Sequence, residues 1–293
     1  MKNQNIYLSH HLQSGYPAVF QELCKALDKS GVNHYFLPFS NDIWARDFMP
    51  VHVSGGEYLG YIYRPDYLYD NVRNRQYITE QYLATGDLPI NYIAKLDAII
   101  DGGNFVFCDD KMIMTEKIFS ENPNIRQSKL ISMIEEACQK ELILIPWDME
   151  EEYGHADGMV SYIGNGKLLL NNYCQMGKDG VGFSKRLHKI LNPHFTVTEL
   201  HYNSPWEESN AAYINYVETS SSVIIPALSA KHDCASDIAA LETFKKIFKK
   251  EILQVFAQPL IRDGGALYCV TWDFFLKDTE EIVTENTNKE EQL

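Results

Sequence analysis

The chain has 293 residues, 45% of them apolar, which supports a packed core and excludes a wholly disordered protein. Its formal net charge of −14 argues against nucleic acid as a partner; it is compatible with a cationic ligand, although many proteins are acidic only for solubility. No apolar run reaches the roughly 18 residues of a membrane span and no signal peptide is evident, so we expect a cytoplasmic protein with no membrane partner.

Four pairs of short apolar segments, each pair separated by a turn, predict β-hairpins. They span residues 50–63, 104–114, 159–170 and 216–225. The Asn-Gly pair at 165–166 is the clearest of the turns, because this dipeptide adopts the tight turns that join antiparallel strands.

Between the hairpins, apolar residues at helical spacing predict helices, each followed by a short apolar strand. The expected helices are 17–27, 76–83, 128–139, 183–191 and 236–249. The expected strands are 34–37, 98–100, 142–145, 195–197 and 252–256. We interpret five units of about 55 residues as one domain, residues 1–276, followed by an acidic tail, 277–293, with the composition of a disordered segment.

Polar motifs recur between these units. Asp47, Asp101 and His155 follow one another at intervals of 54 residues, Asn215 precedes Cys269 by 54, and the remaining interval is 60. Each motif is expected where a buried inner strand ends. A repeat of this length predicts a propeller-like or solenoid architecture that aims all five positions at one axis.

The six cysteines include no Cys-x-x-Cys pair, so the sequence predicts neither a zinc site nor a disulfide scaffold. Cys269 differs from the rest because it follows the glycine pair 264–265 at a motif position, where another group can approach closely. The others are expected to be inert, mostly buried residues: Cys24, Cys108, Cys138, Cys174 and Cys234.

His155 and Asp157 are two residues apart and, on a strand, would point to the same face, as general acid–base catalysis requires. A structural His–Asp pair is the alternative. Taken singly, Asp47 could form a local ion pair with Arg46, and Asp101 could belong to an ordinary turn.

Brought together, these residues form a set of one cysteine, one histidine, three carboxylates and an asparagine. The set has no obvious oxyanion hole, and its negative charge suits a planar cation, because two carboxylates can each accept paired N–H bonds from a guanidinium. A thiolate could then attack the central carbon. A single histidine among carboxylates matches zinc ligand sets poorly, so no metal or cofactor is expected.

Four of these segments resemble the agmatine deiminase and bacterial peptidylarginine deiminase family: residues 41–50, 101–104, 154–157 and 264–269. The resemblance covers about residues 35 to 275. It implies the fold of the guanidino-group-modifying enzymes, a five-bladed α/β-propeller called the pentein fold.

By this resemblance, Cys269 is the nucleophile, and His155 protonates the departing ammonia and then activates water. Asp47 and Asp157 bind the guanidinium nitrogens, and Trp44 packs against the aliphatic part of the substrate.

Asp101 and Asn215 correspond to an active-site Glu and an active-site Asn of the family. The chain departs from the family pattern at two further positions, with Tyr268 in place of a His and Met49 in place of a Gly.

The loop Arg64-Pro65-Asp66 lacks the second arginine with which the peptidylarginine branch grips a carboxylate. Asp66 would repel a carboxylate and suit a free amine. The leading prediction is a metal-free hydrolase that converts agmatine to N-carbamoylputrescine for putrescine synthesis. Arginyl peptides or arginine are the second substrate class, and a catalytically idle cation-binding propeller is the alternative of another kind. The oligomeric state, for which a homo-oligomer is one option, is left open.

Overall fold

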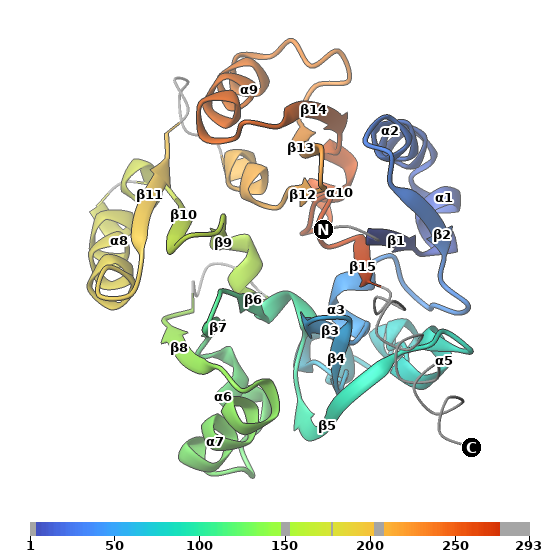
Figure 1. Cartoon of the computed structure of the whole chain (residues 1–293), viewed down its shortest axis with the longest axis vertical. Coiled ribbons are helices and arrows are strands. Elements are labelled where there is room, and N and C mark those ends of the chain that lie inside the picture. The colour runs from blue at the N-terminus through green and yellow to red at the C-terminus, as the bar shows by residue number, and fades with distance from the viewer. Residues whose placement is uncertain (1–3, 148–152, 177, 202–207, 276–293) are drawn as a thin grey trace, which may run out of the picture.

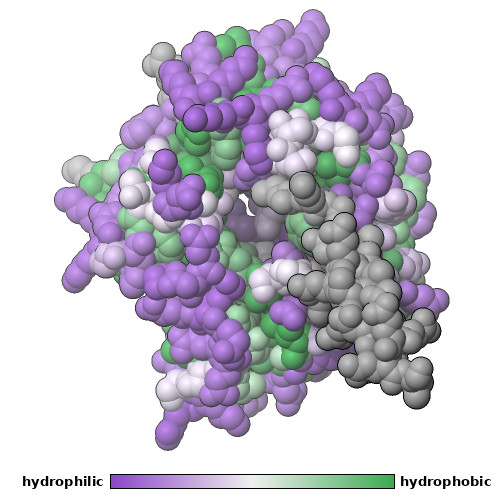
Figure 2. Space-filling view, in the orientation of Figure 1, coloured by the Kyte–Doolittle hydropathy of each residue, from purple (hydrophilic) through white to green (hydrophobic). Residues whose placement is uncertain are grey.

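The computed structural model describes residues 4–147, 153–176, 178–201 and 208–275. These residues form five separate three-stranded sheets, which Figure 1 shows arranged around a common centre. Figure 2, in the same orientation, shows a mostly hydrophilic surface with a hollow near that centre. The expected tail at 277–293 lies outside the described residues.

Each sheet repeats one topology. The strands are β1 (Gln4–Leu8), β2 (Asn33–Phe36), β3 (Val51–Ser54), β4 (Glu57–Ile62), β5 (Asn91–Ile99), β6 (Val106–Phe107), β7 (Lys111–Thr115), β8 (Glu141–Ile145), β9 (Val160–Tyr162), β10 (Lys167–Asn171), β11 (Thr196–Leu200), β12 (Val217–Glu218), β13 (Ser222–Ala227), β14 (Glu251–Phe256) and β15 (Thr271–Phe275). In the order β6-β7-β8, for example, β6 pairs antiparallel with β7 and β8 pairs parallel with it. The four predicted hairpins are confirmed.

The strand that precedes each motif is an edge strand, which corrects the expectation of a buried inner one. β8 and β11 each contain exposed and half-buried residues, whereas the middle strand β13 is buried along its whole length. The middle strand is the buried one because it is paired on both sides.

The two ends of the chain build the fifth sheet together. β15 pairs antiparallel with β1, and β1 pairs parallel with β2, so the order is β15-β1-β2. This sheet has the same pattern as the other four, but no turn joins its first two strands. The sequence patterns therefore missed β1 and β15.

Helices pack beside the sheets. They are α1 (His10–Gly15), α2 (Pro17–Lys29), α3 (Ala45–Phe48), α4 (Asp66–Tyr69), α5 (Gln81–Thr85), α6 (Lys117–Glu121), α7 (Gln127–Cys138), α8 (Lys178–Leu191), α9 (Ala235–Ile247) and α10 (Gln258–Arg262). Short 3-10 helices lie at η1 (Asn74–Tyr77), η2 (Gly102–Asn104), η3 (Ala156–Gly158), η4 (Tyr173–Met176) and η5 (Glu208–Ile214). Within the described ranges, no helix is long and apolar enough to cross a membrane.

Four of the five predicted helices are confirmed, and the one expected at 76–83 is wrong. The chain there forms η1 and α5, separated by an extended segment. Asn41 holds that segment, because its side chain donates to the carbonyl of Ile78 and its backbone N–H donates to Thr79 Oγ1. A tertiary contact thus interrupts a locally favourable helix.

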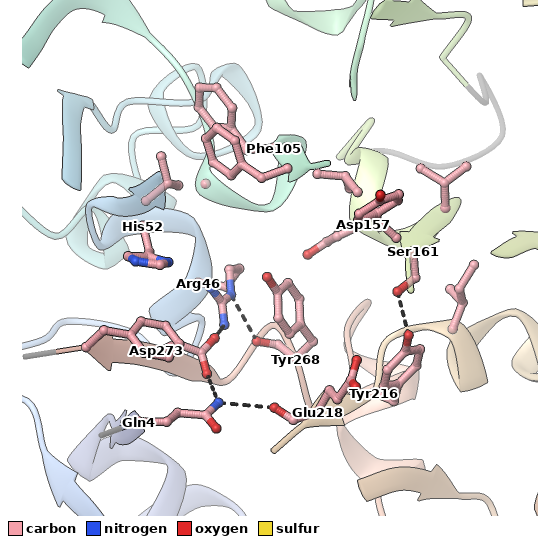
Figure 3. Close-up of a pocket in the computed structure, with 18 residues that line it drawn as sticks. Gln4, Arg46, His52, Phe105, Asp157, Ser161, Tyr216, Glu218, Tyr268 and Asp273 are labelled. Carbon is pink, nitrogen blue, oxygen red and sulfur yellow. Dashed lines mark hydrogen bonds and ion pairs between the residues drawn. The ribbon is translucent and has the colours of Figure 1, made fainter. Parts of the chain in front are cut away.

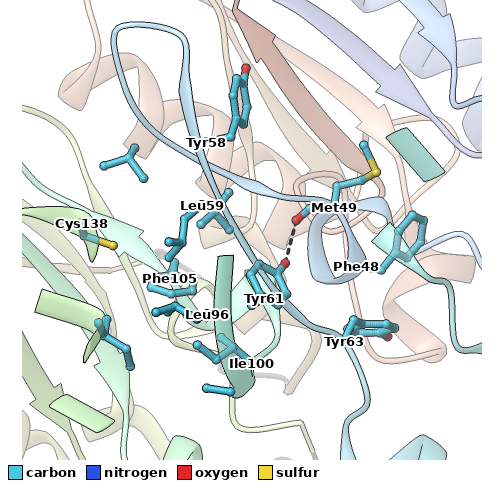
Figure 4. Packing of buried hydrophobic residues seen from close by; sticks show 14 of the residues in the cluster. Phe48, Met49, Tyr58, Leu59, Tyr61, Tyr63, Leu96, Ile100, Phe105 and Cys138 are labelled. Carbon is cyan, nitrogen blue, oxygen red and sulfur yellow. Dashed lines mark hydrogen bonds between the residues drawn. The ribbon is translucent and has the colours of Figure 1, made fainter. Parts of the chain in front are cut away.

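The hydrophobic core beneath α3 explains the departure at Met49. This side chain is fully buried among apolar neighbours that include Phe48. Figure 4 shows Tyr61 directed at this segment, where its hydroxyl donates to the backbone carbonyls of Asp47 and Met49, at 2.7 Å each. Met49 is therefore a packing residue, and the tyrosine fixes the backbone that carries Asp47.

Candidate active site

The structure brings the five repeating positions together. The backbone N–H of Arg46 donates to the carbonyl of Cys269 at 3.0 Å, which joins the first motif to the last. Side-chain contacts described below join the others. The polar side chains of the site are all buried, with exposed fractions of 5 to 8%: Asp47, Asp101, His155, Asp157, Asn215 and Cys269.

His155 lies between two carboxylates. Its Nε2 donates to Asp101 Oδ2 at 2.8 Å, and its Nδ1 lies 3.6 Å from Asp47 Oδ1. Burial alone would lower the pKa of His155, but the charges of Asp47, Asp101 and Asp157 outweigh that effect and raise the pKa to about 10. The resting imidazole is therefore a cation that carries the proton needed by a general acid.

His155 and Asp157 do not sit on a strand, as the sequence suggested. His155 caps the 3-10 helix η3, and Asp157 lies within that helix. A 3-10 helix completes a turn in three residues, so these two side chains point in different directions, His155 to one cavity and Asp157 to another.

Asp47 is presented by the four-residue helix α3. Burial raises the pKa of this carboxyl to about 8, because the cationic His155 does not fully offset the desolvation and the like charges of Asp101 and Asp157. Asp47 Oδ1 is buried and has no hydrogen-bond partner among the described residues. A buried acceptor of this kind is suited to a donor that arrives with a ligand.

Gly103 makes room for this arrangement. A Cβ at this position would lie 2.7 Å from Asp47 Oδ1 and 2.7 Å from His155 Nδ1. Any side chain would push the acid and the histidine apart, so the glycine in the second motif is a steric requirement of the site.

The side chain of Asn215 fixes the backbone at Cys269. Asn215 Oδ1 accepts the backbone N–H of Tyr268 at 3.0 Å and that of Cys269 at 3.2 Å. Burial and the charges of Asp157 and Asp47 raise the pKa of the Cys269 thiol well above its usual value. The resting group is therefore a thiol, and a cation placed beside it would favour the thiolate.

Asp47, His155 and Cys269 form the floor of a cavity of about 360 Å³, which we call the front cavity. Trp44 forms part of the wall and packs so closely on Gly265 that a Cβ there would lie 2.4 Å from the indole. The tryptophan thus has the position expected for contact with an aliphatic chain.

Two acids that the sequence analysis missed lie in the same cavity. Asp42 and Asp263 line it together with Tyr16, whose hydroxyl donates to Asp263 Oδ2. Asp263 is exposed and Asp42 is half-buried, so this group lies nearer the solvent than the buried floor. Asp42 lies within the segment 41–50 and Asp263 directly precedes the segment 264–269, and this proximity to the motifs was the available signal.

Tyr67 is a further residue that the sequence analysis missed. It belongs to α4, lines the front cavity, and donates its hydroxyl to Asp101 Oδ2 at 3.0 Å. A phenol and an imidazole thus share one carboxylate oxygen, which fixes the orientation of Asp101. No spacing pattern pointed to this residue.

In the loop predicted to contact the substrate, the charged side chains of Arg64 and Asp66 lie against other residues. Asp66 pairs with the buried Lys117 at 2.5 Å, and the guanidinium of Arg64 lies 4.8 Å from the ring of Tyr69. Neither Arg64 nor Asp66 lines the front cavity. Asp66 instead begins helix α4, and so helps to place Tyr67.

Asp157 lies at the back of the reaction centre. It lines a second cavity, of about 300 Å³, which we call the back cavity and which Figure 3 shows. Its charge acts on Cys269 and His155 at the front and on Arg46 at the back. Asp157 is therefore part of the wall between the two cavities.

Sequence comparison relates the chain to known deiminases. A family model described as Porphyromonas-type peptidyl-arginine deiminase matches residues 12–274. A curated protein of Marinomonas sp. (strain MWYL1), named "Putative agmatine deiminase", is 22% identical over 278 residues, which cover 79% of this chain and 73% of that protein.

Solved structures share the fold. The agmatine deiminase of C. jejuni superposes with a TM-score of 0.70 at 16% identity, over 94% of this chain and 93% of that one. The agmatine deiminase of Enterococcus faecalis superposes with a TM-score of 0.70 at 15% identity, over 94% of each chain.

The fold and the sequence match together define a deiminase, a hydrolase that acts on carbon–nitrogen bonds. More particularly, the chain belongs to the Porphyromonas-type peptidyl-arginine deiminase family. The resemblance drawn from four short motifs is confirmed.

Proposed function

We propose that this protein hydrolyses the guanidino group of a small substrate with a free amine, with agmatine as the first candidate, to give N-carbamoylputrescine and ammonia. The five sheets would act as the blades of a propeller that holds the site at its axis. The observation that carries this proposal is the front cavity, which has a cysteine, a histidine and a carboxylate at its floor and two further acids nearer the solvent.

The covalent route follows from the positions of four side chains. The guanidinium pairs with Asp47 and Asp157, and its positive charge favours loss of the Cys269 thiol proton to solvent. The thiolate then forms a bond to the central carbon. The carbon–nitrogen bond breaks as His155 donates its proton, and ammonia leaves. A water then gives one proton to His155 while its oxygen attacks the same carbon. The carbon–sulfur bond breaks as the remaining proton on that oxygen passes to the sulfur, which releases the ureido product and restores the Cys269 thiol.

The substrate preference rests on Asp42 and Asp263. Two acids at the outer part of the cavity attract the ammonium end of agmatine and repel the carboxylate of arginine. Among the described residues, the lining of this cavity includes no lysine or arginine that could bind a carboxylate. Asp66, which suggested an amine substrate from the sequence, takes no part in this argument because it pairs with Lys117.

A peptidyl-arginine substrate is the second candidate, and the description of the matching family favours it. A catalytically idle, cation-binding protein is the alternative of a different kind. Tyr268 favours this alternative because it replaces a histidine of the family pattern. The buried set around Cys269 favours catalysis.

The experiment is ammonia and ureido-product release from the purified protein, with agmatine, arginine and a C-terminal-arginine peptide side by side. Each substrate is paired with a Cys269→Ala control. We expect turnover of agmatine that vanishes in the control. Turnover of the peptide alone would reject the amine preference, and no turnover of any guanidine would favour the idle protein.

A further inference from the structure

The wall between the front and back cavities is thin. At three motifs, one residue lines the front cavity and a residue next to it, or two positions away, lines the back cavity. The pairs, front residue first, are Asp47 and Arg46, His155 and Asp157, and Cys269 and Tyr268. The back cavity therefore reaches the reaction centre from the side opposite to the acids of the front cavity.

The back cavity has a fixed, polar lining next to this wall. Figure 3 shows Arg46 held by Asp273, with 2.6 Å between Nη2 and Oδ2, and its guanidinium lies 3.7 Å from the ring of Tyr268. Ser161 donates to the hydroxyl of Tyr216 at 2.8 Å. Arg46 is thus occupied, and the hydroxyl groups offer hydrogen bonds to small polar molecules.

The proposed chemistry is served by a second way in and out. While the covalent intermediate exists, the rest of the substrate stays bonded to Cys269 and its chain lies in the front cavity. Ammonia must nevertheless leave the central carbon, and a water must reach the same carbon. A cavity behind the wall can serve both molecules without release of the substrate.

We propose that the back cavity receives the ammonia released from the guanidino group and supplies the water that hydrolyses the intermediate. This inference rests on the proposed function. Asp157 marks the point of passage, because it lines the back cavity while its charge acts on Cys269 and His155.

The test narrows the back cavity without touching the catalytic residues. Ser161→Trp fills it from β9, and Ser161→Ala is the matched control, because it removes the same hydrogen bond to Tyr216 and adds no bulk. His52→Trp fills the cavity from β3, with His52→Ala as its control. Two pairs from different sheets keep the test decisive if one variant fails to fold.

Two rates are measured for each variant. The first is kcat for ammonia release from the substrate that the wild type turns over. The second is the rate at which 2-chloroacetamidine, a guanidinium mimic that enters through the front cavity, alkylates Cys269. We expect the tryptophan variants to lose at least fivefold in kcat relative to their alanine controls and to keep the alkylation rate of the wild type.

Equal kcat values for the tryptophan and alanine variants of both pairs would contradict the proposed route through the back cavity. A parallel loss of kcat and of the alkylation rate would also contradict it, because that result would mean that the tryptophan disturbs the reaction centre itself. A wild type that releases no ammonia from any guanidine contradicts the proposed function instead, so the two failures are distinct.

Discussion

The imidazole of His155 donates to Asp101 Oδ2 at 2.8 Å through one nitrogen and faces Asp47 Oδ1 at 3.6 Å with the other. Two acids that look equivalent in the repeat therefore differ in their tasks. Asp101 is bonded to the histidine and to Tyr67, so it positions the ring. Asp47 lines the front cavity and remains available to a ligand.

Asp101→Asn should lower kcat by at least about tenfold, because general acid–base catalysis by a well-placed histidine is worth ~10²–10⁴. The loss of charge also lowers the pKa of His155, so activity should decline at a lower pH than in the wild type. The pH profile of kcat measures both effects. Asp109→Asn is the control, since Asp109 is exposed in a hairpin turn, and it should change kcat by less than about twofold. An unaltered pH profile for Asp101→Asn would show that Asp101 does not control the pKa of His155.

Ligand binding should release a proton from Asp47. Burial, together with Asp101 and Asp157, raises the pKa of this group to about 8, against the opposing effect of His155. Near pH 7 part of the Asp47 population is therefore protonated, whereas a guanidinium pairs with the ionised form. Binding of agmatine to Cys269→Ala should tighten as the pH rises toward 8, by up to about 1.4 kcal/mol per pH unit.

Titration calorimetry of this variant in two buffers of different ionisation enthalpy measures the affinity and the proton release together. Asp47→Asn should abolish the released proton. Weaker binding at the higher pH would contradict the assignment.

Cys269 should react selectively with cationic reagents. Burial and two neighbouring carboxylates hold the pKa of its thiol well above the usual value, so neutral 2-chloroacetamide should label it slowly. The amidinium of 2-chloroacetamidine has nearly the same shape and carries the charge that favours the thiolate. Mass spectrometry of the labelled sites should show a preference of at least tenfold for the cationic reagent at Cys269 and none at the exposed Cys174. Equal labelling rates of Cys269 by the two reagents would show that the neighbouring carboxylates do not control the reactivity of this thiol.

Asp42 and Asp263 should govern the choice of substrate rather than the rate of the chemistry. Asp42→Asn should raise the KM for agmatine at least threefold and leave its kcat within twofold, because the interaction is with the distal amine. Butylguanidine lacks that amine and is the matched control substrate, for which KM should not change. The same comparison applies to Asp263→Asn. A KM that rises equally for agmatine and butylguanidine would mean that these acids maintain the shape of the cavity and do not bind the distal amine.

Lys117 should stabilise the fold through the loop that carries Tyr67. Its buried ammonium lies 2.5 Å from Asp66 and 2.8 Å from the buried Glu121. Lys117→Met leaves Glu121 without its cation and should lower the free energy of unfolding by about 3 kcal/mol, as is typical when one partner of a buried pair is removed. Urea denaturation measures the loss. Lys117→Met with Glu121→Leu should recover part of it, and no recovery would mean that the ion pair is not the cause.

The repeat made the floor of the site predictable from the sequence. Asp47, Asp101, His155 and Cys269 recur at nearly constant spacing, and equal units place equal positions in equal surroundings. The spacing predicts that these residues share a site, whatever the local conformation is. This prediction therefore does not depend on the strand expected at His155, which instead caps a 3-10 helix.

Residues contributed by single loops could not be found in this way. Tyr67 and Asp263 occur once, outside the repeat, and only the folded loops bring them into the front cavity. Arg64 and Asp66, which a motif match placed at the substrate, have partners nearby in space, Tyr69 and Lys117, that engage their charges. Side-chain pairing between distant segments is not encoded in spacing.

The sheet built from both ends of the chain has a consequence for biosynthesis. Cys269 precedes β15 by two residues, and β15 takes its place by pairing with β1, which is synthesised long before it. This contact spans nearly the whole sequence, so it forms late and slowly compared with the local hairpins. The thiol of Cys269 is thus placed after the acids and the histidine, and a nascent or truncated chain would carry those residues without the proposed nucleophile.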